Sequence, residues 1–200
     1  MVRLLREGAA MDQLATLEYA LDELREVVAT LGNAQMDTVT NCDPWTVRRL
    51  ASHALNNQLL WAGLVTGQEL VSFADTMGAV PIDGDLGPVA GQIVERAMAL
   101  WRSDGVLEAT HPTPFGELPG SVVVNFPTVD AIAHAWDLGA SVGHPIEFRP
   151  EALAAISAVV QATCTDAARA AGLIRPATEP PADASATERL MAAAGRSPRR

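Results

Sequence analysis

The sequence contains no lysine, so all 14 of its basic residues are arginines, and they are outnumbered by 24 aspartates and glutamates. The formal net charge of the 200-residue chain is therefore −10, and no basic stripe interrupts its acidic character. Nucleic acids and anionic membrane surfaces are both recognised through clustered positive charge. We therefore expect neither nucleic acid nor a membrane among the partners.

Cysteine is also scarce, because Cys42 and Cys164 are the only two and stand far apart. This spacing does not indicate a disulfide framework. The longest stretch without a charged side chain, residues 50–68, carries several polar groups and is a poor membrane span. Residues 1–8 are charged and lack the apolar core of a signal peptide. These absences predict a cytoplasmic protein.

Helical periodicity dominates the first half of the chain. Apolar residues spaced three and four apart predict a helix over 14–31, and Gly32 ends it. Asp43 is the predicted N-cap and Pro44 the first residue of a second helix that continues to about Thr66. Residues 72–87 are rich in glycine and aspartate and predict a loop. A third helix is expected over 85–101.

The second half alternates turns with helices. Residues 111–120 are compatible with a hairpin or an extended loop. One helix is expected over about 120–138, kinked or interrupted at Pro127, and another over 150–172. Ser185 and Glu188 form a capping-box pattern for a short last helix through Ala194.

We therefore predict an all-α protein, a four-helix bundle with a long crossover connection and a short C-terminal helix. We expect one bundle domain over 11–172, with 173–200 packed on that same domain.

Three residues form the pattern with the clearest chemical meaning. Asp130 and His134 are four apart, so on a helix their side chains share a face. His53 shares the spacing of a mostly apolar stripe and is expected to face the interior. Two imidazoles and one carboxylate on facing helices predict a divalent metal site with open positions. The alternatives are a surface hydrogen bond between Asp130 and His134 and an ordinary core histidine at position 53.

Two further residues belong to this hypothesis. Asp137 can accept a hydrogen bond from the ring nitrogen of His134 that does not face the metal, because metal-ligating histidines are commonly oriented in this way. Alternatively, Asp137 is a solvated helix residue. Asn57 lies one turn beyond His53 and could line the pocket.

Other side chains are predicted to have structural roles. Cys42 precedes a helix N-terminus, where a thiol pKa can fall, but the local sequence offers no histidine to serve a nucleophile. Cys164 is expected to pack in mid-helix. The remaining candidates are Trp45 and Trp136, expected in the core, and His111 and His144, expected to be exposed.

Four segments resemble a known family. They are Cys-Asp-Pro-Trp-Thr-Val-Arg-Arg-Leu-Ala-Ser-His at 42–53, Pro-Phe-Gly-Glu-Leu-Pro-Gly at 114–120, Asp-Ala-Ile-Ala-His-Ala-Trp-Asp-Leu at 130–138, and the ending at 183–196. In this order they resemble the DinB-like superfamily, in its mycothiol-dependent maleylpyruvate isomerase branch. The resemblance extends over about residues 11–196.

The resemblance implies a metal-binding four-helix bundle in which His53, Asp130 and His134 are the ligands. The isomerase has glutamate where this chain has Asp130, and other branches have a third histidine. This departure leaves zinc, iron and nickel open, with zinc expected first. The implied partners are mycothiol as a low-molecular-weight thiol and a small-molecule electrophile. The implied activity is S-transfer or isomerisation, with no catalytic residue beyond the metal site.

Two other functions remain open from the sequence. The first is a non-catalytic, stress-related metal-binding bundle. The second is metal-dependent hydrolysis with Asp137 as the base. The sequence does not specify the electrophile or the oligomeric state.

Overall fold

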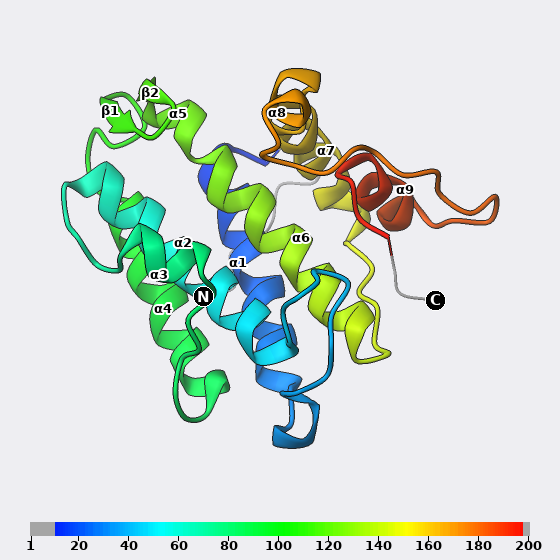
Figure 1. The fold of residues 1–200 in the computed structure, drawn as a ribbon. Coiled ribbons are helices and arrows are strands. Elements are labelled where there is room, and N and C mark those ends of the chain that lie inside the picture. Colours follow the sequence, from blue (N-terminus) through cyan, green and yellow to red (C-terminus); the bar gives the residue numbers. More distant parts are fainter. Residues whose placement is uncertain (1–10, 198–200) are drawn as a thin grey trace, which may run out of the picture.

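Four long helices form the bundle in the computed structural model, which describes residues 11–197 (Figure 1). They are α1 (Gln13–Thr30), α2 (Val47–Thr66), α4 (Leu86–Trp101) and α6 (Asn125–Ser141). Helices α1 and α2 each pack against both α4 and α6. The all-α bundle is therefore confirmed. Residues 1–8, which lack a signal-peptide core in the sequence, lie outside the described residues.

Local signals account for the ends of most of these helices. Asp12 caps α1 by accepting a hydrogen bond from the Ala15 amide, and Asp85 caps α4 through the Gly87 amide. Helix α2 ends at Gly67, whose φ of 66° is in the left-handed region that glycine adopts without strain. The helices expected over 14–31 and 85–101 are confirmed within one residue at each end.

The start of α2 differs from the prediction. The helix begins at Val47 with Thr46 as N-cap, and not at Asp43 and Pro44. The Trp45 amide donates to Cys42 O, and both the amide and the hydroxyl of Thr40 donate to Trp45 O. These bonds hold residues 40–46 as a turn that folds back on itself. The backbone N–H and C=O groups of these residues therefore form hydrogen bonds within the turn and not within a first turn of α2.

The connections hold small elements that the sequence left open. A short 3-10 helix, η1 (Asn33–Gln35), lies in the connection between α1 and α2. A short α-helix, α3 (Phe73–Met77), lies between α2 and α4, in the region predicted as a loop. Strands β1 (Thr110–Thr113) and β2 (Gly116–Pro119) pair as an antiparallel hairpin. Residues 110–119 are therefore a hairpin and not an extended loop.

The helix expected over 120–138 is interrupted, but not at Pro127. Helix α5 (Gly120–Val123) ends at Val124, and Pro127 lies in the first turn of α6. Proline is tolerated in a first turn because its missing N–H has no partner there. Gly120 is required by close packing, since a Cβ there would meet the carbonyl oxygen of Val106.

The C-terminal part also differs in one place from the prediction. Helix α7 (Pro150–Thr163) ends at Cys164, and a separate helix, α8 (Asp166–Ala170), follows it. The Thr165 hydroxyl accepts from the Ala168 amide and so begins a new helix, which makes the single helix over 150–172 wrong. Cys164 consequently lies at a helix end, half-buried, and not in mid-helix.

The last helix confirms the capping-box prediction. The Ser185 hydroxyl accepts from the Glu188 amide, and the Glu188 carboxylate accepts from the Ser185 amide at the start of α9 (Ala186–Ala193). Helix α7 packs on α6 and α1, and α9 packs on α7 (Figure 1). Among the described residues, every helix is too short or too polar to cross a membrane.

Tyr19 provides a test of this packing at alkaline pH. It is the only tyrosine in the chain, is 3% exposed, and accepts a hydrogen bond from the Arg149 amide at 3.1 Å. Burial, together with the neighbouring Glu23, raises the pKa of Tyr19 from 10.0 to about 12. The unfolded chain loses this proton near pH 10 and the folded chain near pH 12. Stability should therefore fall by roughly 2 kcal/mol as the pH rises between these values.

Tyrosinate absorbance measures this pKa directly, because the chain has no second tyrosine. Chemical unfolding of the wild type and Tyr19→Phe at pH 8 and pH 11 measures the part of this stability loss that develops up to pH 11. The absence of lysine removes the other common side chain that titrates here. An absorbance midpoint near pH 10, or an equal alkaline loss in Tyr19→Phe, would contradict the prediction.

Candidate metal centre

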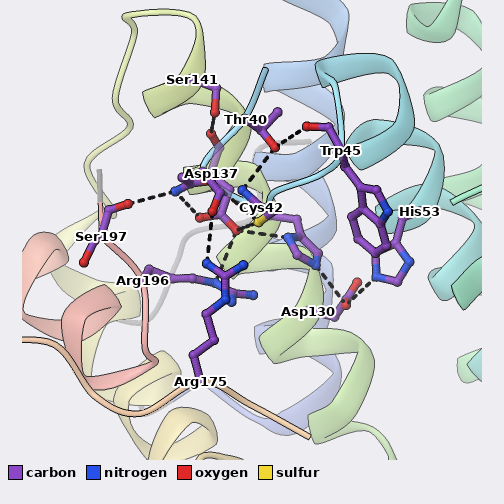
Figure 2. Close-up of polar contacts among 12 residues, drawn as sticks. Thr40, Cys42, Trp45, His53, Asp130, Asp137, Ser141, Arg175, Arg196 and Ser197 are labelled. Atoms are coloured by element: carbon purple, nitrogen blue, oxygen red, sulfur yellow. Dashed lines mark hydrogen bonds and ion pairs between the residues drawn. The ribbon is translucent and has the colours of Figure 1, made fainter. Parts of the chain in front are cut away.

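The packing of α2 against α6 brings together the three residues predicted as ligands, and Figure 2 labels two of them, His53 and Asp130. His53 lies on α2, and Asp130 and His134 lie one turn apart on α6. Asp130 Oδ1 is 3.5 Å from His53 Nε2 and 3.4 Å from His134 Nε2. One ligand atom from each residue lies within 4.8 Å of the other two. Both histidines are buried, so the surface hydrogen bond considered for Asp130 and His134 is wrong.

The other ring nitrogens are held by hydrogen-bond acceptors. His53 Nδ1 lies 2.8 Å from the Thr76 carbonyl oxygen, and His134 Nδ1 lies 3.0 Å from Asp137 Oδ2. An acceptor at Nδ1 favours the tautomer with the proton on Nδ1 and a lone pair on Nε2. Both lone pairs then point at the space beside Asp130. Helix α3 supplies Thr76, so the segment predicted as a loop positions one of the imidazoles.

Asp137 is completely buried, so the alternative that it is a solvated helix residue is wrong. Besides His134, its carboxylate accepts from Asn41 Nδ2 at 2.8 Å and from Cys42 Sγ at 3.1 Å, and Arg196 Nε lies 3.2 Å away (Figure 2). Burial alone would raise the pKa of Asp137, but the Arg196 charge and the His134 hydrogen bond lower it. Asp137 is therefore an anion facing the outer nitrogen of His134.

Asp130 has a polar neighbour that the sequence analysis missed. Gln58 donates its amide to Ala54 O at 3.1 Å and approaches Asp130 Oδ2 at 3.4 Å. Within the described residues, Gln58 and not the predicted Asn57 makes this contact, although Asn57 is also buried. Gln58 follows Asn57 directly in the sequence, but only Asn57 has the spacing of the stripe that contains His53, so the pattern predicted Asn57 alone. The amide leaves Asp130 Oδ1 facing the two imidazoles.

The charges in this cluster depend on one another. Burial opposes ionisation of Asp130, but His134 and His53 hold the pKa of its carboxyl well below the ordinary value. Burial would likewise lower the pKa of His134, but Asp130 and Asp137 raise it. The half-buried Asp130, at the Nε2 atoms of both histidines, and the buried Asp137, at Nδ1 of His134, thus both favour positive charge at the imidazoles. A proton or a metal cation would satisfy them there.

Other side chains follow or depart from their predicted roles. Trp136 is buried in the core, as predicted, and His144 is exposed. Trp45 is half-buried against the core, with its ring centroid 4.6 Å from that of His53. The prediction that His111 is exposed is wrong, because it is buried with Nε2 2.7 Å from Val106 O in the turn before the hairpin.

Cys42 shows what the local sequence could not indicate. No histidine stands near it along the chain, yet its thiol belongs to a buried group with His134 and Asp137. The thiol lies on the Nδ1 side of His134, away from the space between the two Nε2 atoms. Residues 42 and 137 are separated by 95 positions, so only the tertiary fold brings them together.

The residues that form this site lie within a segment that matches a known protein family. Residues 17–139, more than half of the chain, match the model of the mycothiol maleylpyruvate isomerase N-terminal domain. The chain belongs to this family. The matched segment contains His53, Asp130, His134 and Asp137, whereas Arg196 lies beyond it.

Two relatives and one solved structure are also similar to this chain. Uncharacterized proteins from two strains of Mycobacterium tuberculosis, CDC 1551 / Oshkosh and H37Rv, are each 31% identical over 146 residues, which is 70% of this chain and 73% of theirs. The crystal structure of the mycothiol-dependent maleylpyruvate isomerase superposes with a TM-score of 0.62 at 20% identity. The match covers 80% of this chain and 71% of that one. At this identity the superposition supports the fold.

Proposed function

We propose that this protein binds one divalent cation, zinc in the first instance, through His53, Asp130 and His134. We further propose that it uses the cation in a thiol-dependent S-transfer or isomerisation of a small electrophile. The observation that carries the proposal is the convergence of two Nδ1-anchored imidazoles on one oxygen of Asp130. A hydrogen bond alone needs only one imidazole at that oxygen.

The donor set fits such a cation. Two neutral imidazoles and one carboxylate are borderline ligands that suit Zn²⁺, and they also suit iron and nickel. The ligand atoms are close enough to share an ion after small side-chain adjustments. Three protein ligands leave coordination positions open for a substrate or cosubstrate.

Each neighbouring residue would have a defined role around the cation. Thr76 and Asp137 hold the imidazoles in the ligating tautomer, and Gln58 holds the second oxygen of Asp130. A bound divalent cation would supply Lewis acidity and favour the thiolate form of an added thiol. The half-buried Trp45 ring packs against the His53 ring at a tilt of 40° and helps to fix its position.

The thiol would come from outside the protein. Cys42 lies on the far side of His134 and donates to Asp137, while Cys164 lies at the end of α7 beside Thr163. The family name and the name of the structural neighbour support mycothiol as this cosubstrate. The residues would then bind and orient the partners without acting as nucleophiles.

Elemental analysis of the purified protein tests the centre. About one equivalent of metal is expected in the wild type after reconstitution with zinc, iron or nickel. His53→Ala and Asp130→Ala should lose it, and His144→Ala, at an exposed histidine, should keep it. Circular dichroism controls for folding. Absence of metal in the folded wild type would overturn the proposal.

Activity is tested separately on the reconstituted protein. Mycothiol and a small electrophile such as maleylpyruvate are supplied, and product formation is followed with the wild type and with Asp130→Ala. Metal-dependent turnover by the wild type alone is the expected result. Metal binding without any thiol-dependent turnover would instead support a non-catalytic metal-binding bundle.

A further inference from the structure

A second set of metal-type donors lies on the other side of the His134 ring. Cys42, His134 and Asp137 offer ligand atoms within 4.8 Å of one another, and all three residues are buried. Thiolate, imidazole and carboxylate together bind zinc and softer cations such as cadmium. The chain therefore holds two adjacent donor sets that share His134, and only one of them contains sulfur.

Arg196 lies against the sulfur-containing set (Figure 2). Its Nε is 3.2 Å from Asp137 Oδ2, and its side chain is 18% exposed. This nitrogen makes no hydrogen bond with any described residue, so a charge rather than a directed N–H faces the carboxylate. The guanidinium stays protonated at any physiological pH.

Contacts within residues 175–196 position Arg196 beside Asp137. The Arg196 amide donates to Met191 O at 2.8 Å, and the Thr178 hydroxyl donates to Arg196 O at 2.8 Å. Gly195 has a φ of 77°, and a Cβ there would lie 2.6 Å from the carbonyl oxygen of Arg175. A turn that only glycine fits therefore positions the arginine at Asp137.

We propose that Arg196 determines which donor set takes the metal. Its guanidinium occupies the cation position beside Cys42, His134 and Asp137, and so leaves a cation only the sulfur-free set of His53, Asp130 and His134. The physical reason is repulsion, because a fixed positive charge next to Asp137 opposes any second cation there. In the native protein this role rests on the metal centre proposed above. Arg196 thereby keeps the protein thiol out of coordination and reserves thiol chemistry for an external thiol.

Titration with Cd²⁺ tests the proposal, because a Cd–thiolate bond gives an ultraviolet charge-transfer band that nitrogen and oxygen ligands do not give. Arg196→Gln should acquire a band at Cd²⁺ concentrations at least ~100-fold below any that produce it in the wild type. As the Cd–S bond forms, the thiol proton of Cys42 passes to solvent. Adding Cys42→Ser to Arg196→Gln should abolish the band and so exclude Cys164 as its source.

Two variants separate charge from structure. Arg196→Lys keeps a cation and should behave like the wild type. Arg175→Gln is the matched control, because Arg175 belongs to the same segment and donates to the Asn41 carbonyl at 3.0 Å without contacting Asp137. It should show no band. Arg196→Met, with a side chain of similar length, serves as a second neutral variant if Arg196→Gln does not fold.

Two outcomes would overturn the proposal: a Cys42-dependent band in the wild type at the Cd²⁺ concentrations that produce it in Arg196→Gln, or no such band in a folded neutral variant. Both are independent of the first centre. If His53, Asp130 and His134 bind no metal, elemental analysis of the wild type shows it, while the comparison of Cd–thiolate bands remains valid. His53→Ala leaves Cys42, Asp137 and Arg196 in place and can be used as the background for the same titration.

Discussion

Replacing His134 with alanine is expected to weaken metal binding by at least ~100-fold in the folded protein. His134 presents Nε2 to Asp130 and Nδ1 to Asp137, so the substitution removes one ligand and disconnects the anion behind it. Structural zinc sites bind with roughly 10–16 kcal/mol shared among about four ligands, so one ligand contributes about 3 kcal/mol. The dissociation constant should therefore rise at least ~100-fold. Competition with a chromophoric chelator measures it.

The control for this experiment is His144→Ala, since His144 is exposed and lies just beyond the helix that carries His134. It should bind metal with wild-type affinity. Wild-type affinity in His134→Ala would instead show that the cation binds elsewhere. That result would contradict the proposal that His53, Asp130 and His134 bind the cation together.

Asp137→Ala is expected to cost the largest amount of stability of any single polar substitution considered, about 3–5 kcal/mol at neutral pH. The substitution leaves the His134 Nδ1–H and the Asn41 amide without this acceptor, and it removes the anion that faces the Arg196 guanidinium. Groups that lose a partner inside the protein cannot recover hydration, so the cost exceeds that of an exposed ion pair. Asp137→Asn keeps an acceptor oxygen and should fall between the alanine variant and the wild type.

The matched control is Asp22→Ala. Asp22 also pairs with an arginine, at 3.0 Å, but both side chains are about 40% exposed. Its loss should cost at most about 1 kcal/mol. Denaturant unfolding measures both variants, and equal losses would contradict a special role for the buried carboxylate.

The pH dependence of this difference has a fixed sign. The pKa of Asp137 is lower in the folded protein than in the unfolded chain. Its contribution is therefore fully present above the ordinary aspartate pKa and is lost as the pH falls through the folded value. The difference between wild type and Asp137→Ala should accordingly narrow in acid.

The confirmed predictions concern residues that are only a few positions apart in the sequence. The four-residue spacing of Asp130 and His134 and the capping box at Ser185 are confirmed, because a helix fixes these relations within a few residues. The prediction of a single helix over 150–172 was wrong, and the cause is also a short-range interaction. The Thr165 hydroxyl offered the backbone an alternative start that the apolar pattern did not reveal.

The environment of the metal centre depended on longer-range contacts. The sequence named Asp137 but did not decide between a solvated residue and a partner of His134, and burial under the C-terminal segment decided it. Gln58, Thr76, Cys42 and Arg196 had no local signal for a place near the centre. Each reaches it from a different segment, and a helical pattern shows only which face a residue shares, not what packs against that face.

By itself, then, the sequence determined the helical bundle and the shared face of Asp130 and His134, because periodicity and spacing are local properties of a helix. The family and the set of three proposed ligands came from the resemblance of four segments to known proteins. The tertiary structure alone decided that the two imidazoles share one oxygen of Asp130, that Asp137 is a buried anion, and that Arg196 faces it. The longest of these contacts, between His53 and Asp130, joins residues 77 positions apart in sequence. Packing of whole helices brings such segments together, and the buried charges then require the partners that the fold places beside them.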